Sequence, residues 1–118
     1  MSIQLKRIYE QANKNDGTRV LVDRIWPRGV SKDEAKLDHW LKEIGPSSGL
    51  RKEFNHDPEK FPKFKDTYKQ ELESGEQKEQ FDKLKDIVKN NSKVTILFAA
   101  KDEKHNQAVI LKELLENY

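Results

Sequence analysis

The chain has 118 residues, no cysteine, and 23 basic against 21 acidic side chains, which gives a formal net charge of +2. This length suits a single domain, residues 1–118, and the charge balance excludes a global field for nucleic-acid or membrane binding. The lack of cysteine excludes disulfides and thiolate chemistry. The mean hydropathy of −1.01 is low, but the apolar residues gather in patterned runs that predict a folded protein. No run approaches a transmembrane span, so we expect a cytoplasmic protein.

Three apolar segments predict strands. The first alternates, with Ile3 and Leu5 on one face and Ile8 on the other. The unbroken apolar runs of the other two suit burial on both faces, as in parallel or central strands. The link between the first two strands is shorter than a usual parallel crossover, which leaves a truncated helical turn or an antiparallel hairpin. The predicted strands are 3–9, 18–23 and 93–100.

Capped and amphipathic segments predict helices. Ser31 and Glu34 form a capping-box pattern that begins a short helix or turn. Apolar residues at helical spacing between Leu37 and Ile44 predict a second helical element, which Gly45-Pro46 ends. The remaining predicted helices are 49–55, 61–72, the segment after Ser74 that carries Phe81 to Val88, and 105–116. The sequence therefore predicts an α/β fold, with a small, mostly parallel sheet of about three strands packed with several helices.

Polar residues follow the second and third predicted strands, and ligands of open α/β sheets bind at the carboxyl ends of strands. If these strands are parallel neighbours, the two polar segments meet beside the amino terminus of the last helix. Arginine binds carboxylate or phosphate at two points, and a helix amino terminus favours anions. The sequence therefore predicts a site for a small anionic ligand, such as a phosphate, nucleotide or carboxylate. The predicted ligand-binding residues are Arg7, Asp23, Arg24, Trp26, Arg28, Lys101 and Asn106.

The same residues allow other interpretations. In a structural one, Asp23 pairs with a neighbouring Arg24, Arg28 or Lys6, Trp26 covers the edge of the core, and the loop is a structural lock. Asp23 can serve as a general base only if burial raises its pKa, whereas the adjacent arginines are expected to lower it. A third interpretation is a non-enzymatic module that binds protein or nucleic acid through an exposed tryptophan and arginine patch.

The sequence carries no recognisable metal or cofactor motif. His39, His56 and His105 are scattered, without the spacing that metal ligands require. Phosphate-binding, dinucleotide-binding and nucleophile-elbow motifs are also missing. The lysine-rich stretch 60–89 alternates with acidic residues and predicts a solvated helix face rather than a nucleic-acid surface. We therefore predict no metal site, and the motifs assign no cofactor, reaction or oligomeric state.

The run Val22-Asp23-Arg24-Ile25-Trp26-Pro27-Arg28-Gly29 resembles the YeaO-like branch of domain-of-unknown-function family 488. The resemblance continues through 43–47, 50–52 and 100–102, and covers nearly the whole chain. It implies a parallel α/β core with a shortened first crossover helix. It also points to Asp23, Arg24, Pro27 and Arg28 as the positions after the second strand that match the family. Relatives in the wider family carry a cysteine in the third strand and a Cys-His-Arg run opening the last helix. This chain has Phe98 and Asn106-Gln107-Ala108 there, so the resemblance carries over no thiol chemistry.

Overall fold

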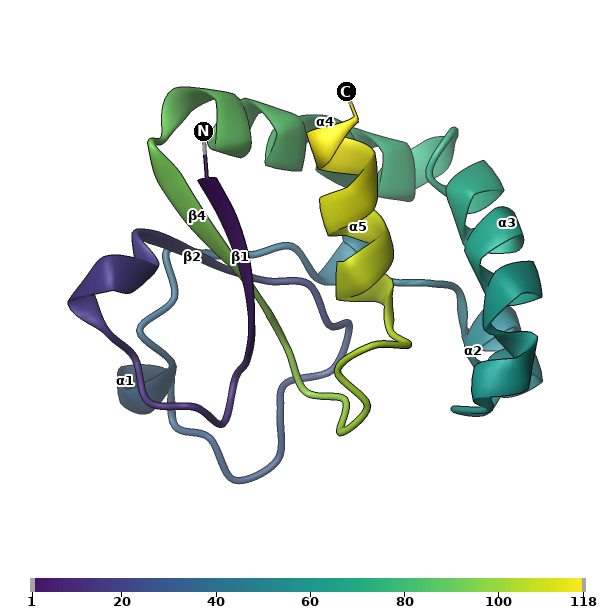
Figure 1. The fold of residues 1–118 in the computed structure, drawn as a ribbon, viewed down its shortest axis with the longest axis horizontal. Coiled ribbons are helices and arrows are strands. Elements are labelled where there is room, and N and C mark those ends of the chain that lie inside the picture. Colours follow the sequence, from purple (N-terminus) through teal and green to yellow (C-terminus); the bar gives the residue numbers. More distant parts are fainter. Residues whose placement is uncertain (1, 118) are drawn as a thin grey trace.

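A computed structural model describes residues 2–117, which form an α/β fold with four strands and five α-helices (Figure 1). The strands are β1 (Ser2–Arg7), β2 (Thr18–Leu21), β3 (His39–Trp40) and β4 (Lys93–Phe98). The α-helices are α1 (Lys32–Ala35), α2 (Ser48–Phe54), α3 (Phe61–Glu71), α4 (Gly75–Asn90) and α5 (Gln107–Glu116). Three short 3-10 turns are η1 (Lys14–Asp16), η2 (Lys42–Ile44) and η3 (Pro58–Lys60). The predicted fold class is confirmed.

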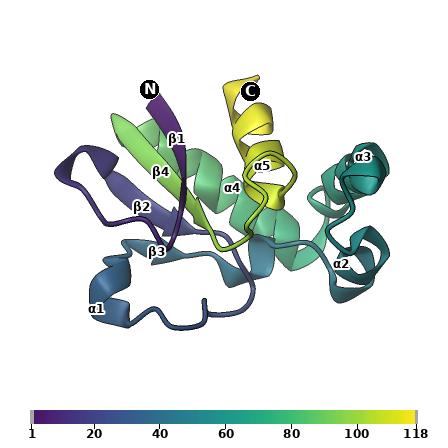
Figure 2. The ribbon, with the colours of Figure 1, turned by 60° about the horizontal axis from the view of Figure 1, so that its bottom comes forward.

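The four strands form one parallel sheet in the order β1-β4-β2-β3 (Figure 2). The central strands are the two that the sequence marks by unbroken apolar runs, and Leu21 pairs with Leu97 in their register. The first crossover contains the truncated helical turn η1, so the antiparallel alternative is wrong. Gly17 ends this turn at φ 66°, and a Cβ atom there would lie 2.4 Å from the carbonyl oxygen of Lys93. Only glycine therefore lets the crossover pass this close to β4.

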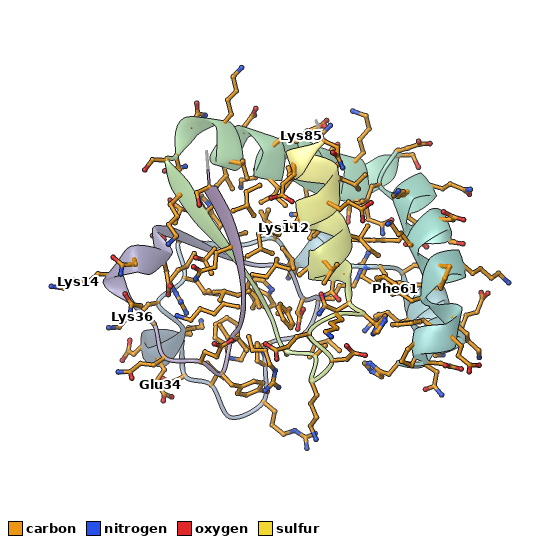
Figure 3. The ribbon with its side chains drawn as sticks, viewed as in Figure 1. Lys14, Glu34, Lys36, Phe61, Lys85 and Lys112 are labelled. Carbon is orange, nitrogen blue, oxygen red and sulfur yellow. The ribbon has the colours of Figure 1, made fainter. Side chains whose placement is uncertain are left out.

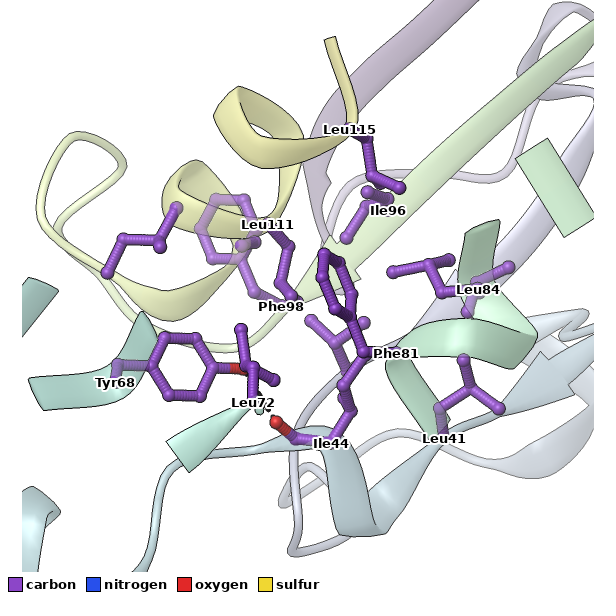
Figure 4. Close-up of a cluster of buried hydrophobic side chains, with 14 of the residues drawn as sticks. Leu41, Ile44, Tyr68, Leu72, Phe81, Leu84, Ile96, Phe98, Leu111 and Leu115 are labelled. Atoms are coloured by element: carbon purple, nitrogen blue, oxygen red, sulfur yellow. Dashed lines mark hydrogen bonds between the residues drawn. The ribbon is translucent and has the colours of Figure 1, made fainter. Parts of the chain in front are cut away.

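The main core lies on one face of the sheet, where the side chains of Val94, Ile96 and Phe98 meet helices α2 to α5. Figure 4 shows Ile96 and Phe98 beside Leu111 and Leu115 of α5. Tyr68 of α3 is fully buried in this core, and its hydroxyl donates to the carbonyl oxygen of Ile44 at 2.6 Å (Figure 4). Burial raises the pKa of Tyr68 and keeps the hydroxyl protonated as a donor.

The other face of the sheet carries a smaller cluster, in which Ile8, Leu21 and Leu97 pack against Ala35 of α1. Ser31 caps α1 as the sequence predicts, because its hydroxyl accepts from the amide of Glu34 and the Glu34 carboxylate accepts from the amide of Ser31. The segment after β2 therefore covers this face and returns along the sheet edge to form β3.

The predicted helix between Leu37 and Ile44 is wrong, because the segment forms β3 and η2 instead. Lys36 adopts a left-handed conformation that ends α1. The following segment then pairs with the free edge of β2 as strand β3, and the amide of Leu41 donates to the carbonyl of Leu21 at 2.9 Å. Leu37 packs in the smaller cluster while Ile44 packs in the main core, so the helical spacing of these residues does not define one face.

Within residues 2–117, the charged side chains lie at or near the surface, except for those of Asp16 and Arg19, which are buried. Lys14 and Lys36 are exposed (Figure 3), and Lys78 in the predicted solvated stretch is exposed and pairs with Asp82. Asp16 is only 2% exposed, and Arg19 is 4% exposed. The carboxylate of Asp16 accepts from Lys6 Nζ at 3.1 Å and from Arg19 Nη1 at 2.5 Å. Burial by itself raises the pKa of Asp16, but hydrogen bonds from the Asn13 amide and from these two cations bring it below its ordinary value.

Candidate functional site

An open pocket of about 720 Å³ lies at the carboxyl edge of the sheet. The loop after β2 (23–28) and the loop after β4 (99–102) both line it, because the two strands are parallel neighbours that end on the same edge. Helix α2 and its carboxyl-terminal turn supply Arg51 and His56, and the start of α5 supplies Gln107. The pocket brings together five of the predicted site residues, which are Asp23, Arg24, Trp26, Arg28 and Lys101.

Asp23 is held between the end of β4 and the start of α5. Its Oδ2 accepts from the amide of Ala99 at 3.0 Å, and its Oδ1 accepts from Gln107 Nε2 at 2.5 Å. These donors differ from the cationic partners that the structural interpretation proposed. Burial raises the pKa of Asp23, and the hydrogen bonds and the charge of Arg51 offset this only in part. The expectation that adjacent arginines lower this pKa below its ordinary value is therefore wrong.

Arg24 lines the pocket, but its guanidinium donates to the chain. Nε lies 2.9 Å from the carbonyl oxygen of Pro46, and Nη2 lies 2.8 Å from that of Gly45. Nη1 pairs with Glu43 at 3.3 Å. Arg24 therefore fixes the loop after β2 to the segment that follows η2, which fits the structural lock.

Arg7 and Asn106 lie outside the lining of this pocket. Arg7 donates to the carbonyl oxygens of Ala99 and Ala100, both at 2.9 Å, and so joins the end of β1 to the loop after β4. Asn106 is the N-cap of α5: its Oδ1 accepts from the amide of Val109 at 3.1 Å, and its Nδ2 donates to the carbonyl of Asp102 at 2.9 Å. Both side chains therefore hold the backbone of the loop after β4 in place.

Three cations of the pocket have no such internal role. Arg28, Arg51 and Lys101 are exposed, and among residues 2–117 none of their side chains has a hydrogen-bond or ion-pair partner. The sequence singled out Arg28 and Lys101 by their places after strands. It missed Arg51 and His56 as site residues, because chain order does not reveal that α2 packs beside this edge. Arg51 lies within residues 50–52, a segment of the family resemblance, and this membership was the sequence signal that could have identified it.

Helix α2 is anchored at its start, which positions Arg51. The hydroxyl of Ser47 accepts from the amide of Leu50 at 3.2 Å and donates to a Glu71 oxygen at 2.6 Å. Burial raises the pKa of Glu71, but hydrogen bonds from Ser47 and Gln77 outweigh this and lower it, so the carboxylate stays ionised as an acceptor. The helix that carries the unpaired Arg51 is thus tied to α3.

Two tryptophans, Trp26 and Trp40, contact each other next to the loop after β2. The rings of Trp26 and Trp40 meet edge to face, with centroids 5.2 Å apart. Trp26 Nε1 donates to the carbonyl of Val30, and Trp40 Nε1 donates to that of Asp23, both at 2.7 Å. Trp26 forms part of the pocket wall, with its indole nitrogen turned to its own loop.

The three histidines come from β3, the turn after α2 and the loop before α5, and only His56 and His105 line a common cavity. Within residues 2–117, no group of three or more His, Asp or Glu side chains is close enough together to hold a metal ion. Over the same range, none of the helices combines the length and apolar character needed to cross a membrane.

Comparison with known proteins identifies the family. A family model described as "Inactive DUF488-N3 subclade" matches residues 2–118. The chain belongs to the DUF488 family. YeaO of Escherichia coli K12, described as uncharacterized, is 42% identical over 117 residues, which cover 99% of each chain. Uncharacterized proteins of Mycobacterium tuberculosis H37Rv and Mycobacterium bovis are each 36% identical over 113 residues, or 96% of this chain and 92% of theirs. No solved structure matches the chain.

The predicted resemblance to the YeaO-like branch of DUF488 is thus confirmed. Phe98 and Asn106, where the resemblance implies that this chain lacks cysteines of the wider family, have structural roles. Phe98 is 1% exposed in the main core, and Asn106 caps α5. Gln107, next in the chain, reaches the pocket and holds the carboxylate of Asp23.

Proposed function

We propose that the protein binds a small anionic ligand in the pocket at the carboxyl edge of its sheet. One observation carries the proposal: Arg28, Arg51 and Lys101 line the same pocket, and their charged groups form no hydrogen bond or ion pair within residues 2–117. Arginines that only hold a fold donate to acceptors of their own chain, as Arg7 and Arg24 do. Free guanidinium and ammonium groups around a hollow are suited to bind carboxylate or phosphate.

The proposal is for binding without chemical turnover, in the cytoplasm. The matching family model is described as inactive, and we carry that description over to this chain. The Asp23 carboxylate already accepts from the Ala99 amide and from Gln107, which suits a group that shapes the floor of a pocket.

Isothermal titration calorimetry tests this function with inorganic phosphate, a nucleoside monophosphate and a sugar phosphate. At least one of them is expected to bind the native chain, and the double variant Arg28→Gln/Arg51→Gln is expected to weaken that binding at least about tenfold, since each charge-assisted hydrogen bond contributes roughly 1.5–3 kcal/mol. The control Lys14→Gln/Lys83→Gln removes the same charge from exposed lysines that do not line the pocket. Equal loss of affinity in both double variants would show binding by net charge alone and reject the site.

A second function has one observation in its favour. Ile25 is 69% exposed on the pocket rim, beside Arg28 and near the edge-to-face tryptophans. An exposed apolar side chain beside aromatic rings and cations favours a module that binds protein or nucleic acid. Electrophoretic mobility with single- and double-stranded probes at two salt concentrations tests the nucleic-acid version, because binding by charge weakens steeply with salt. No shift at low salt rejects it.

A further inference from the structure

A second cavity of about 180 Å³, which we call the side cavity, adjoins the pocket. The two hollows share four lining residues, Arg51, His56, Ala100 and Gln107. Arg51 therefore stands at the junction, with the open pocket on one side and the side cavity on the other.

Aromatic rings form part of the lining of the side cavity, which also includes the polar side chains of Arg51, Asn106 and Gln107. Phe54 and Phe64 line it and stack with centroids 4.3 Å apart and planes 18° apart. His56 lies 6.3 Å from the ring of Phe54. His105 lines the cavity beside the amino end of α5 and meets the ring of Phe61 (labelled in Figure 3) edge to face at 5.2 Å. Such walls accept a flat ring in stacked or edge-to-face contact.

The volume fits one ring. An apolar cavity of roughly 150 Å³ accommodates one benzene molecule, and the side cavity is of this size. The open pocket, in contrast, carries the unpaired charges of Arg28 and Lys101 as well as Arg51. A single molecule that spans the junction meets aromatic carbon at one end and cations at the other.

We propose that the ligand is a small aromatic acid, whose ring enters the side cavity while its anionic group is bound by Arg51 at the junction. This inference rests on the proposed function, because it names the class of anion that the pocket takes. The anionic group is a carboxylate or a phosphate ester, which arginine binds with the same fork of donors.

Calorimetric titration of the native chain with two matched pairs of probes tests the inference. The pairs are benzoate with acetate, and phenyl phosphate with inorganic phosphate. The aromatic member of the tighter-binding pair is expected to bind about tenfold more tightly than its partner, because burial of its ring carbons removes apolar surface from water. The tighter pair identifies the anionic group. Equal affinities within both pairs would overturn the inference and leave the proposed function standing. No binding by any of the four probes would also overturn the inference, and the titrations with the nucleoside monophosphate and the sugar phosphate would then decide the proposed function.

The variant Ala100→Leu tests whether the aromatic ring of the ligand binds in the side cavity. Ala100 forms part of the wall that the two hollows share, and Ala100→Leu adds carbon at the mouth of the side cavity. The tenfold preference for the aromatic probe is expected to fall to about one. If this variant does not fold, the ring resonances of Phe54 and Phe64 in the native chain give a second readout, since a bound ring shifts them. An aromatic preference that survives Ala100→Leu, or unshifted Phe54 and Phe64 resonances at saturation, would overturn the assignment.

Discussion

Gln107 donates from Nε2 to Oδ1 of Asp23 at 2.5 Å, across 84 positions of sequence. The contact joins the residue that follows β2 by two positions to the first residue of α5. Because the amide of Ala99 donates to the other carboxylate oxygen, Asp23 connects three segments at the carboxyl edge of the sheet. The floor of the pocket is therefore built by one side chain that receives donors from the loop after β4 and from α5.

The first prediction concerns this contact. A double-mutant cycle of Asp23→Ala and Gln107→Ala is expected to give a coupling free energy of about 1–2 kcal/mol, since the hydrogen bond joins an amide to a partly buried carboxylate. Urea unfolding of the four proteins measures it. Additive losses, with no coupling, would show that the contact contributes nothing to stability.

The second prediction separates the two arginines of the loop after β2. Arg24→Gln is expected to lower the free energy of unfolding by about 2–3 kcal/mol, because the guanidinium holds the carbonyls of Gly45 and Pro46 and pairs with Glu43. Arg28→Gln, the same substitution on an exposed side chain of the same loop, is expected to cost less than about 0.5 kcal/mol. Urea midpoints compare them, and equal costs would contradict the division between a structural and a free arginine.

The third prediction is a dependence of stability on pH through Asp16. The pKa of Asp16 is lowered in the folded chain, so as the pH falls the unfolded chain takes up this proton first. The contribution of Asp16 to stability is therefore complete above its ordinary pKa of about 3.9 and is lost as the pH falls through the folded value.

Asp16→Asn is the variant that measures this contribution. At pH 7 it is expected to cost about 3 kcal/mol, because it breaks a buried pairing with Arg19 and Lys6. The difference in the free energy of unfolding between the two proteins should stay constant from pH 7 down to about pH 4 and should shrink as the pH falls further towards 3. Parallel curves over the whole range would exclude Asp16 as the titrating group.

The fourth prediction concerns the crossover at Gly17. Gly17→Ala is expected to cost about 3 kcal/mol, because alanine disfavours φ 66° and its Cβ would meet the carbonyl oxygen of Lys93. Gly49→Ala is the control, since no atom lies within 4 Å of a Cβ at that position in α2. This control should be neutral or stabilising by up to about 1 kcal/mol, as alanine favours helix. Equal melting temperatures for the two variants would show that the backbone at position 17 can move to accommodate a Cβ atom, and would contradict the prediction.

Much of the fold could be predicted because the relevant signals are local. The apolar runs that become β2 and β4 specify burial on both faces, and Ser31 with Glu34 forms its capping box within one turn. The segment from Leu37 to Ile44 could not be predicted in this way. Its helical spacing competes with the unpaired edge of β2, and that edge exists only after the sheet has formed.

The site could be predicted only in part, for a similar reason. The place of Arg28 and Lys101 after central strands brings them to one edge, as parallel topology requires. Whether a guanidinium is free depends on which carbonyl oxygens lie near it. The carbonyls of Gly45 and Ala100 come from distant segments, so the internal roles of Arg24 and Arg7 had no sequence signal. Arg51 reaches the pocket only through the packing of α2.

A titration of the arginine side chains with inorganic phosphate, followed by NMR, tests the central claim most directly. The chain has five arginines, Arg7, Arg19, Arg24, Arg28 and Arg51, and the Nε–H signal of each reports on its own surroundings. Arg28 and Arg51 are expected to shift saturably, while the three that donate to their own chain stay in place and serve as internal controls. Uniform small shifts of all five signals, or no shift of Arg28 and Arg51 at any phosphate concentration, would contradict an anion site in this pocket.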